Sequence, residues 1–476
     1  MGEIKMQSTK RSLTDGPIFL RLFLFTLPVM ASGLLQVVYN MADNIVVGSF
    51  SGDNLALAAV GSTGTLTVLI VNFLMGFSTG ASVVIAHSYG AGDDNQLHAA
   101  LHTAAVIAIC GGLTLGSLAF LLANPLLALM GTKAELMSRA VLYFRIIAVG
   151  IPATTVYNLG ASVLRATGDS KRPLYVLAAT GLINVLLNLF FVIVLGMTVD
   201  GVALATVISQ YLSAITVVVM LLRHREERCR LKPRSIGVYR QALSRIIRLA
   251  VPASLQASLF AISNIFIQGG INQLSVAEVS GKTISGNIDG LVYTAVHSYS
   301  TTAMTFVAQN FGARKPERVR KTFLYTVIQV IVVGVLLGQL ILLFGRDIVG
   351  VYVDAADPNR EAVIEYSLEV MRLILTVYFM CGIMDALSGM LRGLGNSVAP
   401  MVIGIVGICV LRMAWILFVF PTEPFHNLTG MYLCYPITWI FCITLLAIML
   451  WREWKRKKGT MLSQDTSLEK RTDTVA

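Results

Sequence analysis

Apolar residues run in long stretches along this chain, and short polar segments separate them. Twelve stretches have about the length of the roughly 20 apolar residues that an α-helix needs to cross the hydrocarbon core of a bilayer. The pattern therefore predicts an all-α integral membrane protein with twelve transmembrane helices. The expected spans are 18–47, 55–78, 98–122, 141–164, 174–196, 201–222, 246–272, 288–310, 322–345, 366–391, 398–420 and 429–451.

The polar remainder of the chain is small and predicts no soluble domain. The expected segments are a cytoplasmic tail (1–17), a six-helix lobe (18–222), a basic linker (223–245), a second six-helix lobe (246–451) and a basic cytoplasmic tail (452–476). A membrane-embedded enzyme needs His, Asp or Glu side chains clustered near an interface, and the sequence shows no such cluster. We therefore expect a protein that is not an enzyme.

Composition and charge support a location in a membrane. Hydrophobic residues make up 55% of the chain and charged residues only 13%, whereas soluble domains contain about 25% charged residues. The net charge of +11 is concentrated in alternate loops, mainly at 223–245, 314–321 and 452–458. Because basic loops stay in the cytoplasm, both termini are expected there, in a multi-pass protein of the cytoplasmic membrane. The charge is thus no sign of a nucleic-acid partner.

The two halves of the chain repeat each other at an offset of about 225 residues. The segment Leu164–Pro173 shares Leu, Arg, Gly, Ser and Pro in register with Leu391–Pro400. Each half holds six spans, so both halves enter the membrane from the same side, and a pseudo-twofold axis along the membrane normal should relate the two lobes. Small-residue spacings recur as well, and they predict close helix packing. These spacings are Gly112 and Gly116 in the first half, and Gly334 and Gly338 in the second.

Four motifs together resemble the multidrug and toxic compound extrusion (MATE) family over roughly residues 17–454. They are Tyr39–Gly48, the repeated Leu-Arg-x-x-Gly-Asp-Ser-x-x-Pro segment that begins at Leu164, Ile183–Asn188 and Gln309–Ala313. The resemblance implies two lobes arranged in a V and export of bulky, often cationic compounds in exchange for protons or sodium ions. Within the family, the DinF-type branch fits better than the NorM-type branch.

Asp43 is the first candidate for the transport site. A carboxylate inside a span costs about 2.5–3.5 kcal/mol on insertion scales, and such residues usually face the protein interior. Asn40, Tyr39 and Gln36 lie three, four and seven residues earlier and continue a polar stripe on one helix face. Pro28, further toward the cytoplasm, removes a backbone hydrogen bond and predicts a hinge.

Other polar residues of the first half are expected at a similar depth and could form one pocket with Asp43. They are Tyr143, Asn184, Asn188 and Thr206. By resemblance, Asp43, Tyr39, Tyr143, Asn184 and Thr206 match the proton- or sodium-responsive cluster of the DinF-type branch. Asn188 stands where some members of that branch have a second aspartate. These oxygen atoms suit a proton or a sodium ion, and the sequence indicates no other metal and no cofactor. The alternative is that Asp43 is only a hydrogen-bonded contact between helices.

The second half does not repeat this chemistry, because Ile267 aligns with Asp43. Its candidates are Asp385, Arg412 and His297. Arg412 is expected to reach Asp385 through a structural or water-mediated link, since Asp385 lies about 10 Å nearer the cytoplasm by residue counting. His297 is expected to be a hydrogen-bonded cavity histidine, with a proton relay as the alternative. Asp289 is expected to be solvated.

These observations favour a secondary active antiporter that exports amphipathic, cationic small molecules by alternating access. One alternative is a flippase for lipid-linked saccharides, which would need buried bases such as Arg412 to hold a diphosphate. Another is a membrane scaffold or receptor without transport activity. The expected partners are small-molecule substrates and membrane lipid, and the expected state is a monomer.

Overall fold

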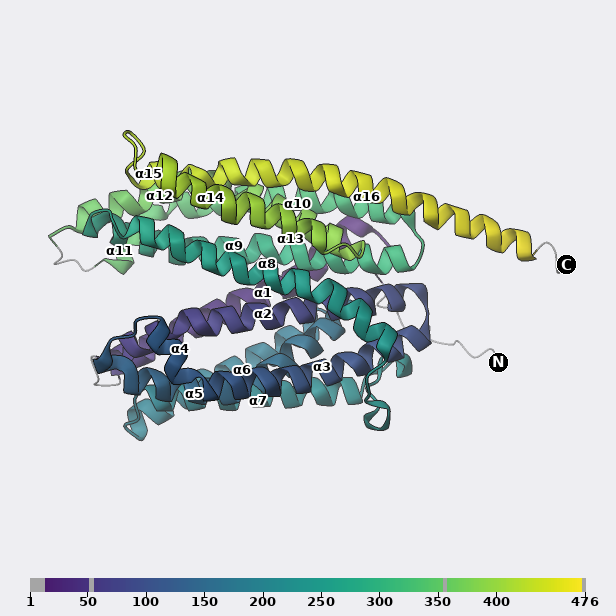
Figure 1. Ribbon diagram of the computed structural model, residues 1–476, viewed down its shortest axis with the longest axis horizontal. Helices are drawn as coiled ribbons and strands as arrows, with labels where there is room; N and C mark the ends of the chain where they lie inside the picture. The colour runs from purple at the N-terminus through teal and green to yellow at the C-terminus, as the bar shows by residue number, and fades with distance from the viewer. Residues whose placement is uncertain (1–12, 51–54, 354–357, 473–476) are drawn as a thin grey trace, which may run out of the picture.

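The computed structural model describes residues 13–50, 55–353 and 358–472, and Figure 1 shows it as a bundle of long helices. Within these ranges the regular structure is entirely helical. The first half contains α1 (Ile18–Phe50), α2 (Ala56–Ala91), α3 (Asp94–Leu121), α4 (Ala123–Leu129), α5 (Ala134–Ala166), α6 (Lys171–Leu189), η1 (Phe190–Val194) and α7 (Val199–Leu222). The linker contains two short turns, η2 (Glu227–Cys229) and η3 (Pro233–Ser235). The second half contains α8 (Arg240–Ile271), α9 (Val276–Gly312), α10 (Pro316–Leu343), α11 (Gly345–Tyr352), α12 (Arg360–Gly393), α13 (Val398–Gly404), η4 (Ile405–Val410), α14 (Leu411–Ala414), η5 (Trp415–Val419), α15 (Leu428–Tyr432) and α16 (Cys434–Thr472).

Eleven helical segments among the described residues are long and apolar enough to cross a membrane. The predicted span 288–310 falls in α9, which has 37 residues but is not one of the eleven. Serine, threonine and histidine side chains make α9 more polar, and a helix surrounded by other helices can carry them because they face protein rather than lipid. The prediction of an all-helical membrane protein is confirmed.

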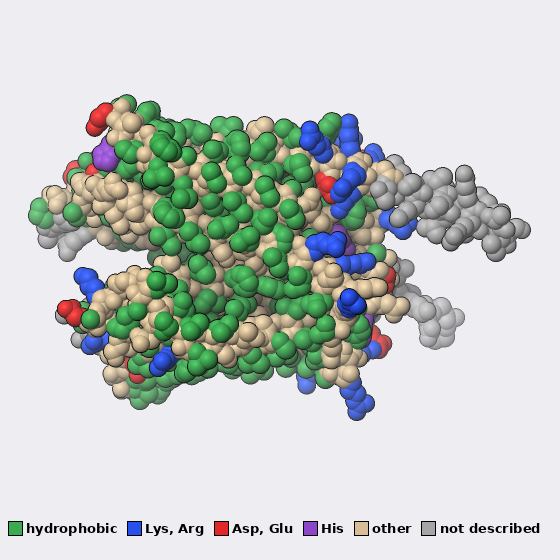
Figure 2. All heavy atoms as spheres, viewed as in Figure 1, with side chains coloured by type: hydrophobic (Ala, Val, Ile, Leu, Met, Phe, Trp, Pro, Cys, Tyr) green, Lys and Arg blue, Asp and Glu red, His purple; other side chains and the backbone are tan. Residues whose placement is uncertain are grey.

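The helices form two groups that lie side by side with their long axes roughly parallel (Figure 1). The helices α2 to α7 make one group and α9 to α16 the other, with α1 and α8 between them. Basic side chains gather at one end of the molecule, where α1 begins and α16 leaves the bundle (Figure 2). We call this the basic end. The segment predicted as a tail from residue 452 continues as helix to Thr472.

The helix α1 packs on both groups in turn. Near its start, Gln329 of α10 donates to the Phe19 carbonyl at 2.7 Å, and Thr26 donates to Thr302 of α9 at 3.1 Å. Several turns further along α1, the Tyr39 hydroxyl donates to the Ala178 carbonyl of α6 at 3.2 Å. The first part of α1 therefore belongs to the second-half group, and only its later part joins the first-half group.

The helix α8 crosses in the opposite sense. The Ser254 hydroxyl donates to the Phe73 carbonyl of α2 at 2.6 Å, whereas further along the Ser263 hydroxyl donates to the Ile408 carbonyl of η4 at 3.2 Å. The earlier parts of the first helices of the two repeats are thus exchanged between the groups, and their later parts return to their own group. The lobe boundaries 18–222 and 246–451 stay a prediction.

Close backbone contacts explain the repeated small residues. A Cβ atom on Gly116 would lie 2.9 Å from the Ala148 carbonyl oxygen, and one on Gly338 would lie 2.5 Å from the Leu375 carbonyl oxygen. Real Cβ contacts are essentially never this short, so the helices α3 and α10 approach their neighbours only because glycine lacks a side chain. The predicted close packing at these positions is confirmed.

Two further glycines bring the two groups into contact at the basic end. A Cβ atom on Gly90 would lie 2.0 Å from the Gln309 carbonyl oxygen, and one on Gly312 would lie 2.1 Å from the His87 carbonyl oxygen. Gly90 and Gly312 occupy corresponding positions in the repeat. The ends of α2 and α9 therefore touch through their backbones at two equivalent positions of the repeat.

Hydrogen bonds reinforce this contact. Gln309 Nε2 donates to the Ala166 carbonyl at 2.6 Å, and His87 Nε2 lies 2.7 Å from the Gly393 carbonyl oxygen. The backbone N–H of Leu13 donates to Gln309 Oε1 at 3.0 Å, which ties the segment before α1 to the same place. At the opposite end a notch separates the two groups (Figure 2). The molecule is thus closed at the basic end and open at the other.

Candidate functional site

Three helices of the first half meet at Asp43. Asn188 of α6 donates through Nδ2 to Asp43 Oδ1 at 2.5 Å, and the Thr206 hydroxyl of α7 lies 3.4 Å from Asp43 Oδ2. Asn184, one turn before Asn188, donates to the Thr206 hydroxyl at 3.5 Å. Four of the five residues predicted to share a pocket therefore form a connected group, which we call the Asp43 cluster (Asp43, Asn184, Asn188 and Thr206).

The Asp43 cluster offers oxygen atoms that lack a donor. Asn188 is fully buried, and its Oδ1 has no hydrogen-bond partner among the described residues. The Thr206 hydroxyl donates to the Val202 carbonyl at 2.9 Å and accepts from Asn184, so one further lone pair is available. A buried acceptor without a donor costs about 1–3 kcal/mol. A water molecule or a sodium ion beside this oxygen would remove that cost.

The tyrosines predicted for this site lie beside the Asp43 cluster without a hydrogen bond to its carboxylate among the described contacts. Tyr143 of α5 lies within electrostatic range of Asp43. Tyr39 bonds to α6 instead, and a Cβ atom on Gly181 would lie only 1.8 Å from its ring. Gly181 therefore gives Tyr39 its place against α6, a role that the sequence analysis did not assign.

Gln36 and Asn40 do not join the Asp43 cluster. Both are exposed, and neither has a recorded hydrogen bond in the described part of the chain. Pro28 lies inside α1, where the Ser32 hydroxyl donates to the Pro28 carbonyl at 2.8 Å, and the helix continues through it. Its role as a hinge stays a prediction.

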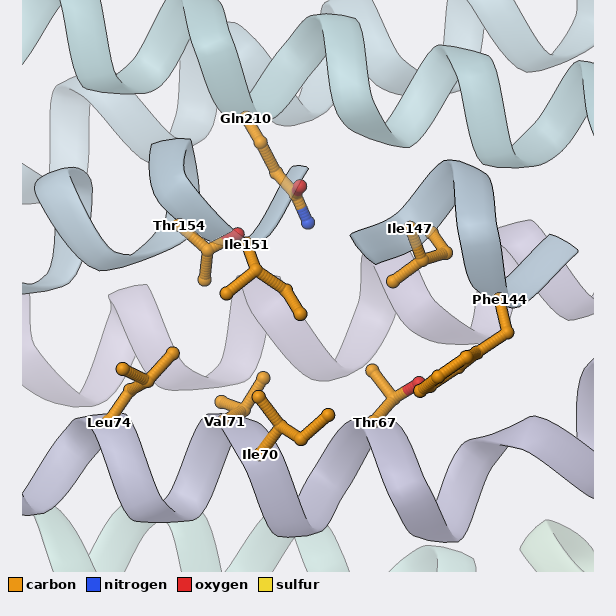
Figure 3. Close-up of a pocket in the computed structure, with 9 residues that line it drawn as sticks. All are labelled: Thr67, Ile70, Val71, Leu74, Phe144, Ile147, Ile151, Thr154 and Gln210. Carbon is orange, nitrogen blue, oxygen red and sulfur yellow. The ribbon is translucent and has the colours of Figure 1, made fainter. Parts of the chain in front are cut away.

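A small cavity of about 30 Å³ lies between α2, α5 and α7 (Figure 3). Its lining is mostly apolar, with Thr67, Thr154 and Gln210 as the polar side chains. Gln210 points into it, and Gln210 Oε1 is buried without a partner among the described residues (Figure 3). The cavity has room for a water molecule. Gln210 follows Thr206 by four residues on α7, a helical spacing that could have drawn attention to it in the sequence.

The second half contains a separate polar pair. His297 Nδ1 of α9 lies 2.7 Å from Asp385 Oδ2 of α12, and the Tyr293 hydroxyl lies 3.3 Å from the same ring nitrogen. The His297 side chain is 46% exposed, whereas that of Asp385 is 11% exposed. The structure therefore joins two of the three second-half candidates in a pair that is open on the histidine side.

Arg412 does not pair with Asp385. Its guanidinium lies 4.1 Å from the centroid of the Tyr435 ring, and its Nε donates to the Thr438 hydroxyl at 3.3 Å. The residue is only 4% exposed, so a cation–π contact and a hydrogen bond accompany its burial. Asp289, expected to be solvated, has a buried Oδ1 without a partner among the described residues, so that expectation was wrong.

Comparisons with known proteins agree with this architecture. The MatE family matches residues 28–190 and 252–418, which is one match in each half. The chain is 26% identical over 452 residues to the probable multidrug resistance protein YoeA of Bacillus subtilis (strain 168), covering 93% of this chain and 95% of that protein. It is 25% identical over 394 residues to the probable multidrug resistance protein NorM of Thermotoga maritima, covering 81% and 82%.

Solved structures show the same fold. One is the outward-facing conformation of a multidrug resistance MATE family transporter of the MOP superfamily, with a TM-score of 0.87 and 21% identity. The match covers 95% of this chain and 99% of that one. The paired family matches cover more than half of the chain and fall on both repeats. The chain therefore belongs to the MatE family of multi-pass membrane transporters, and not to a family of enzymes.

Proposed function

We propose that this protein is a multidrug efflux transporter that exports amphipathic, cationic small molecules in exchange for a cation bound at Asp43. The observation that carries the proposal is the Asp43 cluster, in which a membrane-embedded carboxylate accepts from the Asn188 amide, and the amide oxygen of Asn188 is buried without a donor among the described residues. A carboxylate that binds either a proton or a sodium ion changes the local charge, and the charge change can favour binding or release of a cationic substrate.

The cation and the substrate compete for the same negative charge in this scheme. When Asp43 is ionised, its charge attracts a cationic substrate. When a proton or sodium ion neutralises it, that attraction ends and the substrate leaves. A transporter that opens alternately to the two sides then exchanges one for the other. The restriction of the cluster to the first half supports a site in that lobe and the DinF-type rather than the NorM-type branch.

The orientation follows from the basic end. Because basic residues are retained in the cytoplasm, we place the basic end, with both termini, on the cytoplasmic side. The closed basic end and the open opposite end then correspond to an outward-facing molecule. In this scheme the protein is a monomer, and its two lobes move against each other in the membrane. The lobes are residues 18–222 and 246–451, joined by the linker 223–245.

The flippase alternative gains no support from Arg412. Its guanidinium is buried against Tyr435 and Thr438, so it is not displayed to a diphosphate. The His297–Asp385 pair presents the histidine, which is 46% exposed, and holds it against a carboxylate that is only 11% exposed. The Asp43 carboxylate of the first half favours cationic cargo instead.

The test is efflux of a fluorescent cationic compound from proteoliposomes under separately imposed proton and sodium gradients. Wild-type protein should respond to one of the two gradients, and Asp43→Asn should lose that response. Asp200→Asn is the matched control, because Asp200 is an acid of the same half at the start of α7. Its carboxylate accepts from the Thr198 N–H at 3.0 Å, and the amide oxygen of asparagine can accept the same bond.

Gradient-driven efflux that is unchanged in Asp43→Asn would refute the proposed site. Absence of efflux from wild-type vesicles under either gradient would instead favour a scaffold or receptor. The two outcomes are distinguishable because the first requires active wild-type protein.

A further inference from the structure

A groove of about 440 Å³ lies between α13 and α16 near the basic end. Its walls are apolar, with Val398 and Val402 from α13 and Leu445, Ile448 and Met449 from α16. Val398, Val402 and Ile448 are between 42% and 50% exposed. Because both walls belong to membrane-spanning segments, a partly exposed apolar surface here faces hydrocarbon. An acyl chain fits its chemistry.

The polar residues of the groove are Arg452 and Asn396. Arg452 is exposed, and no ion pair of it is recorded in the described part of the chain. The adjacent acid, Glu453, pairs with Arg456 and Lys457 instead, at 2.7 and 3.4 Å. Asn396 Oδ1 accepts from the Ala399 N–H at 3.1 Å, which leaves its amide N–H groups as donors. The groove therefore ends in a cation and an amide donor.

Trp451 indicates the depth of this polar end. Its ring is 57% exposed, and Lys455 Nζ lies 3.9 Å from the ring centroid. Tryptophan is enriched at the level of lipid headgroups, where its ring is half apolar and half polar. Arg452 is the next residue, so its guanidinium lies at headgroup depth. Leu445 lies roughly 10 Å deeper along α16.

The corresponding position of the first half has a different charge. In the repeat, Asp169 aligns with Asn396, and the Asp169 carboxylate pairs with Arg172 at 3.2 Å. The helices α6 and α7 are also joined directly, because the Ser213 hydroxyl donates to the Thr180 hydroxyl at 2.7 Å. An acid at this place would repel an anion. The combination of groove, base and amide therefore belongs to the second half.

We propose that the groove binds an anionic phospholipid, with its phosphate between Arg452 and Asn396 and one acyl chain along the walls of α13 and α16. Charge complementarity selects this occupant, since the apolar part matches any lipid tail and Arg452 matches an anionic headgroup. The groove lies near the basic end and so belongs to the cytoplasmic leaflet, an assignment that rests on the proposed orientation. Binding itself does not depend on transport.

Native mass spectrometry of the delipidated protein tests the proposal, with phosphatidylglycerol and phosphatidylcholine of identical acyl chains as probes. Arg452→Gln should bind phosphatidylglycerol about fivefold more weakly, because one basic side chain near a membrane surface contributes about that factor. Its binding of phosphatidylcholine should not change. Val402→Trp, which fills the groove, should weaken binding of both lipids.

Arg240→Gln is the matched control, because Arg240 is an exposed base at the start of α8, outside the groove. Equal phosphatidylglycerol affinity in wild type and Arg452→Gln would overturn the proposal. An equal loss in Arg240→Gln would overturn it too, since it would show attraction to the basic surface as a whole. Arg452→Lys should retain the preference, and a thermal unfolding curve for each variant confirms that it is folded.

Discussion

Replacing Gly90 with alanine should open the basic end. The added Cβ atom would lie 2.0 Å from the Gln309 carbonyl oxygen, whereas ordinary van der Waals contact begins at 3.4 Å, so α2 and α9 would have to separate by roughly 1.4 Å. The opposing atom belongs to the backbone and cannot turn away as a flexible side chain could. Overpacking of this kind costs about 1–3 kcal/mol.

This cost applies only to the state in which the two helix ends touch. In a state open at the basic end, the added methyl group would meet no such obstacle, and alanine is a better helix former than glycine. The ratio of closed to open molecules should therefore fall about 5- to 150-fold, the factor that corresponds to 1–3 kcal/mol. Gly312→Ala should act in the same direction, because a Cβ atom there would meet the His87 carbonyl oxygen at 2.1 Å.

Hydrogen–deuterium exchange read by mass spectrometry measures the opening. Peptides that contain the ends of α2, α5 and α9 should exchange faster in Gly90→Ala, since the contact of Gln309 with the Ala166 carbonyl opens with the helices. Gly111→Ala is the control, because a Cβ atom on Gly111 meets nothing within 4 Å. If Gly90→Ala exchanges at these peptides like Gly111→Ala, the backbone contact does not hold the basic end closed.

Three further predictions concern single side chains. Asn188→Leu should weaken the dependence of efflux on the coupling cation more than Thr206→Val, because Asn188 approaches the Asp43 carboxylate at 2.5 Å and Thr206 only at 3.4 Å. Titration of initial efflux rates with the cation gives the order of the two effects. The reverse order would contradict the geometry. Gln210→Leu should leave the midpoint of thermal unfolding unchanged or raise it, since it removes a buried oxygen without a partner among the described residues. A large decrease of the midpoint would mean that a water molecule satisfies that oxygen. Burial raises the pKa of the Cys229 thiol to about 12, so almost none of this thiol should be ionised at about pH 8. Because the side chain is also fully buried, it should react with maleimide only after unfolding. Peptide mass spectrometry locates the label, and modification of Cys229 in the folded protein would show that the linker leaves the bundle.

The spans could be predicted because hydrocarbon imposes a length and an apolar composition on every crossing helix. The same constraint makes depth countable, since each residue adds about 1.5 Å along a helix. This is why counting alone placed Asp43, Asn188 and Thr206 at one level, and the structure joins them. The roles of these residues in transport stay predictions.

Lateral neighbours could not be counted in the same way. Gln36 shares the face of Asp43 on α1, but the neighbours of that face change along the helix because α1 crosses from one group to the other, so Gln36 remains exposed. Likewise, Asp385 meets His297 rather than Arg412, since partners on different helices depend on helix rotation. The repeat indicated Gly90 and Gly312 as equivalent positions, but only the fold brings α2 and α9 together there.

The exchange of α1 and α8 bears on how such a chain could have arisen. A polypeptide of half this length, with six crossings, would expose on each copy the surface that α1 or α8 of the other half now covers. Two identical copies related by a twofold axis would solve this by trading the earlier parts of their first helices, as domain-swapped dimers trade an element. Fusion of the two genes would then have preserved an intertwined dimer in one chain. Co-expression of residues 1–235 and 236–476 as separate polypeptides should therefore yield a complex, while neither fragment alone should be stable.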